Sequence, residues 1–155
     1  MDNFFKYLNL FPMPLWLAMM FAPRHSLTER AGRSSTIFGL AALHYVLAIG
    51  VAMKADAEAR AEARQRGEAL PQVEVTTLNG IRTLLSSRQG TLAAWAHMLA
   101  LDLFAGGWIY RQARRLNAPD WVRIVSLFFT LMTGPFGLLI FLLWRGLRTK
   151  EGEGL

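Results

Sequence analysis

The sequence has no cysteine, so disulfide bonds, thiolate metal sites and cysteine nucleophiles are excluded. It also has few charged residues: they make up 18% of the chain, whereas 53% of the 155 residues are hydrophobic. Most of the charges lie outside four apolar runs. This distribution is typical of a membrane protein and argues against a water-soluble core.

Acidic residues are fewer than basic ones, and the formal net charge is +6. A basic chain can bind nucleic acid, but these basic residues border apolar runs, as they do beside anionic lipid headgroups, and no nucleic-acid motif accompanies them. We therefore exclude nucleic acid as a partner and expect the chain to lie in a lipid bilayer. The sequence leaves open whether the chain also forms a homo-oligomer or binds another membrane protein.

The four apolar runs predict an all-α, polytopic membrane protein with a bundle of four transmembrane helices. We expect these helices at residues 4–22, 37–53, 91–110 and 122–144, within a single domain of residues 1–148. Each run has between 17 and 23 residues, close to the ~20 residues that cross a hydrocarbon core of ~30 Å.

Two of the runs contain helix-breaking residues. Pro12 and Pro14 predict a kink in the first run, and the alternative is an interfacial stretch to Phe11 followed by a short buried helix. In the fourth run, Gly134 and Pro135 predict either a packing kink or unwound backbone that lines a cavity. We expect the kink, which is the commoner of the two.

Residues 54–72 form a charged stretch rich in Ala, Glu and Arg, without an apolar face. We expect a soluble helical insert that continues the second transmembrane helix, supported by two acid–base pairs with i,i+4 spacing. The pairs are Asp56 with Arg60 and Glu62 with Arg66, and Gly67 and Pro71 should end the helix.

The other connecting segments are short. We expect a polar loop at residues 23–36 and a short helix at the membrane interface at residues 73–90. We expect a disordered tail at residues 149–155. Candidate helix N-caps are Ser35 or Thr36 for the second run, Thr91 for the third and Asp120 for the fourth. An aromatic belt is expected at Trp108, Tyr110, Trp121 and Trp144.

The N-terminus has only Lys6 as a positive charge and no convincing cleavage site, so we interpret it as a retained helix and not as a signal or transit peptide. This indicates an integral protein of the bacterial cytoplasmic membrane. Ten Lys and Arg residues lie on the side of both termini and seven on the other, which favours termini inside.

The third run, LAAWAHMLALDLFAGGWIY, contains two ionisable residues, His97 and Asp102. An aspartate at the centre of a membrane helix costs roughly 2.5–3.5 kcal/mol, so its presence indicates a partner, a water-filled cavity or a role. Helical geometry separates the two side chains by about 140° and ~7.5 Å, so they cannot bond directly but could border one interhelical cavity. The structural alternative is that Asp102 pairs with Arg123, Arg145 or His44 and holds the bundle together.

His44, His97 and Asp102 would also make a suitable ligand set for a metal, but their spacing is not diagnostic, and we predict no metal site. No motif indicates another cofactor.

The motif W-x-H followed by D-L-F-x-G-x-W, from Trp95 to Trp108, occurs with PLW at residues 14–16 and TGPFGLL at residues 133–139. With these motifs the chain resembles the abscisic-acid-deficient-four family of small integral membrane proteins, whose plant member is known as a neoxanthin synthase. The resemblance covers most of the chain apart from the charged insert.

The resemblance implies isomerisation of a carotenoid epoxide without a redox cofactor, with His97 and Asp102 as the acid–base pair. A carotenoid or a similar isoprenoid lipid is thus the implied ligand. The alternative function is a non-catalytic small bundle that assists the assembly or stability of other membrane components. Residues expected to contact a substrate are His44, Tyr45, Trp95, Phe104, Gly106, Trp108, Gly134 and Pro135.

Overall fold

A computed structural model describes residues 2–68 and 74–152, and these residues form eight helices and no strand. The chain divides into two compact units. One unit, called unit 1 below, contains residues 1–41 and 98–155, and the other, unit 2, contains residues 42–97. The fold is therefore all-α, as the sequence predicts.

The first apolar run forms two short helices, α1 (Asp2–Leu10) and α2 (Met13–Phe21). The predicted kink is present as a break at Phe11 and Pro12, so the run is two short helices and not one continuous helix over residues 4–22. The physical cause of the break is the pair Pro12 and Pro14, which removes two backbone N–H donors within three residues. Pro14 lies in the first turn of α2, where a backbone N–H would have no acceptor within the helix, so its absence breaks no hydrogen bond there.

A short helix, α3 (Ser26–Arg33), replaces the polar loop predicted for residues 23–36. His25 precedes it with extended backbone, and the His25 Nδ1 atom accepts a hydrogen bond of 3.3 Å from the backbone N–H of Leu27. The segment thus has an N-cap that the sequence analysis did not consider.

Two long helices, α4 (Ser35–Gln65) and α6 (Arg88–Arg115), contain the second and third apolar runs. Among the described residues, these are the two helices long and apolar enough to cross a membrane. The N-caps differ from those predicted: Ser34 Oγ accepts from Ile37 N at 3.4 Å, and Ser87 Oγ accepts from Gly90 N at 2.9 Å.

The charged stretch after the second run is helical as far as Gln65, as part of α4. The Arg60 Nε atom lies 2.7 Å from Asp56 Oδ2, whereas Arg66 pairs with Glu68 and not with Glu62. Pro71, the predicted helix end, lies outside the described residues. The next helix, α5 (Leu78–Ser86), has no buried residue.

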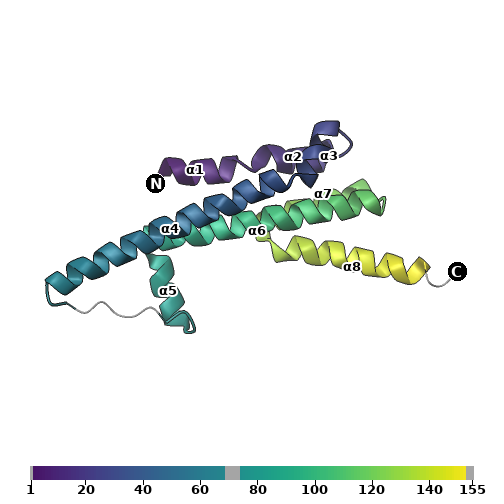
Figure 1. Cartoon of the computed structure of the whole chain (residues 1–155). Helices are drawn as coiled ribbons and strands as arrows, with labels where there is room; N and C mark the ends of the chain where they lie inside the picture. Colours follow the sequence, from purple (N-terminus) through teal and green to yellow (C-terminus); the bar gives the residue numbers. More distant parts are fainter. Residues whose placement is uncertain (1, 69–73, 153–155) are drawn as a thin grey trace. The chain divides into compact units, whose positions relative to one another are not determined.

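The fourth apolar run forms a helical hairpin of α7 (Asp120–Thr133) and α8 (Pro135–Gly152), which pack against each other (Figure 1). The turn residue, Gly134, has φ 59° and ψ −101° and ends α7. A Cβ on Gly137 would lie within 2.3 Å of Thr130 N and Ser126 O, so the two helices approach very closely beside the turn. Leu116 lies just before the start of α7, and Arg148 lies near the end of α8. The Arg148 Nη1 atom donates to Leu116 O at 3.3 Å, so α8 runs antiparallel to α7.

The hairpin corrects two predictions. Residues 122–144 do not form one spanning helix, because the backbone at Gly134 takes a left-handed φ and Pro135 starts a new helix. Residues 149–152, predicted to be disordered, continue α8, and residues 153–155 lie outside the described part of the chain. Asp120 is the first residue of α7 and makes no capping hydrogen bond; its predicted capping role is wrong.

The core of unit 1 contains side chains from α2, α6, α7 and α8. Trp16 of α2 packs on Gly106 of α6, where an added Cβ would lie 2.2 Å from the Trp16 ring. Tyr110 is 2% exposed and donates from its hydroxyl to Pro23 O at 2.7 Å, so it is not part of an aromatic belt. Fully buried members of the core include Met19, Leu103, Ile109, Leu127 and Phe141.

The hairpin makes a testable prediction about membrane sidedness. At ~1.5 Å per residue, the 14 residues of α7 reach about 21 Å, short of a ~30 Å core, and α8 then runs back. If α4 crosses the membrane, Leu147→Cys should be labelled by an impermeant thiol reagent from the same side as Arg24→Cys. Ala57→Cys should be labelled from the opposite side.

The absence of cysteine from the chain leaves no background in this assay. Four crossings, as the sequence predicts, would place Leu147→Cys on the side of Ala57→Cys, and that result would contradict the hairpin as the arrangement in the membrane.

Candidate functional site

Asp102 lies in α6 and is half-buried. Its carboxylate faces the turn of the hairpin, because a Cβ built on Gly134 would lie 2.6 Å from Asp102 Oδ1. Gly134 directly precedes α8, whose first backbone N–H groups have no intrahelical acceptor. The carboxylate therefore lies beside the amino end of a helix, where a negative charge is favoured.

No hydrogen bond or ion pair joins Asp102 to another residue in the described part of the chain. Two of the partners named in the structural alternative, Arg123 and Arg145, do not pair with Asp102. Arg123 binds the Asp120 carboxylate and donates to Met20 O at 3.2 Å, and the guanidinium of Arg145 lies 5.9 Å from the centre of the Trp108 ring.

His97 belongs to unit 2, so the two residues proposed as an acid–base pair fall in different units. The exposed His97 ring lies 5.0 Å from the ring of Tyr45, measured between centroids, with 58° between the planes. His44 is half-buried in the same unit, and Trp95 is 38% exposed. Within the ranges that the structure describes, no group of three histidine or acidic side chains could hold a metal ion.

Two other predicted substrate contacts in unit 1, Gly106 and Trp108, are covered by side chains of the chain itself. Gly106 packs on Trp16, and the Trp108 ring stands edge-on to Phe141 at 5.8 Å between centroids. Phe104 makes a similar contact with Phe38 at 6.2 Å but stays 56% exposed. Of the predicted set in this unit, the structure brings together Asp102 and Gly134, which Pro135 follows.

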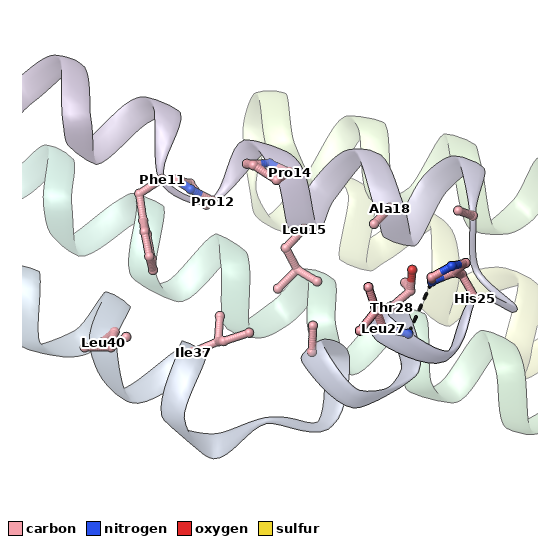
Figure 2. A pocket seen from close by; sticks show the side chains of 12 residues that line it. Phe11, Pro12, Pro14, Leu15, Ala18, His25, Leu27, Thr28, Ile37 and Leu40 are labelled. Atoms are coloured by element: carbon pink, nitrogen blue, oxygen red, sulfur yellow. Dashed lines mark hydrogen bonds between the residues drawn. The ribbon is translucent and has the colours of Figure 1, made fainter.

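The sequence analysis missed a cavity of about 460 Å³ in unit 1 (Figure 2). It is lined by the break between α1 and α2, by α2, by the segment of α3 and by the start of α4. The volume lies within the range of small-molecule sites. Its wall is mostly apolar and includes Phe11, Pro14, Leu15, Ala18, Ile37 and Leu40.

The polar side chains at this cavity are His25 and Thr28, which the sequence placed in a loop. The one signal in the sequence was the pair Pro12 and Pro14, because a break in an apolar helix leaves space that neighbouring side chains must fill.

Comparison with known proteins gives one positive result. A family model described as ABA DEFICIENT 4-like matches residues 3–141. No curated protein and no solved structure matches the chain. Because the family model covers most of the sequence, the chain belongs to the ABA DEFICIENT 4-like family.

Proposed function

We propose that this chain is an integral membrane protein that binds a carotenoid or a similar isoprenoid lipid and isomerises an epoxide on it. Membership of the ABA DEFICIENT 4-like family supports this proposal, and so do the two long apolar helices α4 and α6. The implied family activity is of the neoxanthin-synthase type.

The proposed reaction conserves atoms and electrons. A base removes a proton from carbon, the C–H electron pair forms a new double bond, the epoxide C–O bond breaks, and the released oxygen takes up a proton to become a hydroxyl. No oxidant or reductant is consumed. The step needs one group that accepts a proton and one that donates it, and the proposal assigns these roles to Asp102 and His97.

The observation that carries the assignment is the environment of Asp102. The carboxylate is half-buried in an apolar helix and has no cation or hydrogen-bond partner among the described residues. Retaining an aspartate there costs free energy that a leucine or alanine would not cost. A carboxylate that is not committed to an ion pair keeps its proton available for exchange.

A second function is favoured by the close packing around two other predicted site residues. Gly106 packs on Trp16, and Trp108 packs on Phe141, so both residues of α6 hold this helix against α2 and α8. In this alternative, a non-catalytic bundle that assists other membrane components, Gly106 and Trp108 would serve packing alone.

Conversion of an epoxy-carotenoid by membranes that contain the chain tests the proposal. We expect a product of unchanged mass with a new hydroxyl group, formed only in membranes that contain the chain. Retention of the pigment by the purified chain without conversion would leave only the binding part of the proposal. Neither retention nor conversion, together with loss of other membrane proteins from a host that lacks the chain, would favour the non-catalytic bundle.

A further inference from the structure

The cavity between α2, α3 and the start of α4 has one polar end. Figure 2 shows His25 and Thr28 at one end of the lining and Phe11 and Leu40 at the other, with apolar side chains between them. The His25 Nδ1 atom accepts from Leu27 N, so a neutral His25 ring carries its proton on Nε2. A mostly apolar lining with its polar side chains at one end fits the chain of an amphiphile better than it fits a polar ligand.

Arginines gather at this end of unit 1. We define the basic end as residues 23–33, 110–123 and 145–148, which together contain nine arginines and two acidic residues, Glu29 and Asp120. Three contacts from a side chain to the backbone and one between two side chains hold the three segments together. They are Tyr110 Oη to Pro23 O at 2.7 Å, Arg111 Nη1 to Gly32 O at 2.7 Å, Arg114 Nη2 to Glu29 Oε1 at 2.9 Å, and Arg148 Nη1 to Leu116 O at 3.3 Å.

The two acidic residues offset only two of the nine arginine charges. Glu29 pairs with Arg114 and Asp120 with Arg123. The hydrogen bond and charge of Arg123 lower the pKa of Asp120, and the charges of Arg24 and Arg114 lower it further. Arg24, Arg30, Arg33 and Arg115 are all exposed, so the basic end presents an excess of positive charge to whatever lies beside it.

We propose that the cavity holds an acyl chain of an anionic phospholipid, with the lipid headgroup bound at the basic end beside His25. The apolar wall matches the hydrocarbon chain, and the arginines match the phosphate charge. A zwitterionic phospholipid has the same chain but lacks the net charge. The site shares no residue with Asp102 or His97 and does not depend on the proposed reaction.

Photo-crosslinking of the unmutated full chain tests the site directly. The purified protein in detergent is mixed with phosphatidylglycerol that carries a diazirine in its acyl chain, illuminated, and mapped by peptide mass spectrometry. We expect the label within residues 11–40. The same diazirine chain on phosphatidylcholine should label the segment more weakly, by roughly fivefold for each arginine that the headgroup reaches.

Two variants with matched controls separate the chain from the headgroup. Ala18→Phe places a ring in the cavity and should reduce labelling of residues 11–40 by about tenfold or more. Ala57→Phe, in the charged part of α4, should leave this labelling unchanged. Arg24→Gln with Arg30→Gln should remove most of the preference for phosphatidylglycerol. The equal charge change in Arg64→Gln with Arg82→Gln should keep that preference.

The proposal is overturned if the two lipids label residues 11–40 equally, or if the label falls mainly on other peptides. It is also overturned if the Ala18→Phe variant has the same melting temperature as the unmutated protein and is labelled by phosphatidylglycerol to the same extent. If Ala18→Phe does not fold, the label map of the unmutated chain decides the question.

Discussion

Asp102→Asn should abolish epoxide isomerisation while the protein remains inserted and folded. The amide keeps the shape of the carboxylate but cannot exchange its proton, so the expected loss is about 10²–10⁴-fold in rate. The structure also predicts normal abundance, because no described cation depends on Asp102 and none is left buried without a partner. Turnover and protein amount should be measured on the same membranes.

Asp56→Asn is the matched control for this variant. It makes the same chemical change at an exposed site in the charged part of α4, where Asp56 pairs with Arg60, and should leave turnover unchanged. His97→Gln should resemble Asp102→Asn if the two residues share the chemistry. Full turnover in both Asp102→Asn and His97→Gln at normal abundance would remove them from the mechanism, and the site would then be sought at Gly134 and Pro135.

Gly134→Ala should lower the free energy of unfolding by about 2–4 kcal/mol. The backbone there has φ 59° and ψ −101°, a conformation that L side chains adopt only at a cost of ~1–3 kcal/mol. The new methyl group would also lie 2.6 Å from Asp102 Oδ1, which adds a steric cost that rotation of the carboxylate can partly relieve. Unfolding in mixed micelles gives the difference.

Gly146→Ala is the control, because it lies within α8 and an added Cβ meets nothing within 4 Å. It should be neutral or stabilise by about 0.5–1 kcal/mol. Repeating Gly134→Ala in an Asp102→Ala background separates the two costs. If the destabilisation disappears completely there, the steric contact and not the backbone conformation is its cause.

The apolar runs of the sequence predicted the positions of the two long helices, but the residues at which these helices begin were predicted poorly. Runs 37–53 and 91–110 lie within α4 and α6 because a long apolar stretch free of proline leaves few alternatives to a helix. The N-caps are Ser34 and Ser87, each close to other Ser or Thr residues. Several neighbouring residues can cap a helix, and the tertiary position of the chain decides between them.

Helix breaks were visible in the sequence, whereas their outcome was not. Pro12 and Gly134 both mark a break, but α2 continues onward while α8 turns back along α7. The return requires a left-handed φ at Gly134 and close approach at Gly137, where a side chain would overlap α7. Apolar length alone does not distinguish a crossing helix from two shorter helices folded on each other.

The candidate site was predictable only in part, because its environment comes from distant segments. The cost of an aspartate in an apolar helix singled out Asp102, but only the fold shows that its neighbour is the Gly134 turn and not an arginine. Tyr110 suits a membrane interface as well as a buried hydrogen bond, and only the fold provides the Pro23 carbonyl. The pair Pro12 and Pro14 was the one sequence signal for the cavity, and the rest of its wall, from α3 and the start of α4, depends on the fold.

The contact between Trp16 and Gly106 also sets an order for biosynthesis. The two residues are 90 positions apart in the chain, and ribosomes add about 5–20 residues per second. The face of α2 that carries Trp16 and Met19 therefore waits on the order of 5–20 s before Gly106 exists. A chain that stalls before α6 is made therefore lacks the residue on which Trp16 packs, and the core of unit 1 cannot close around that ring.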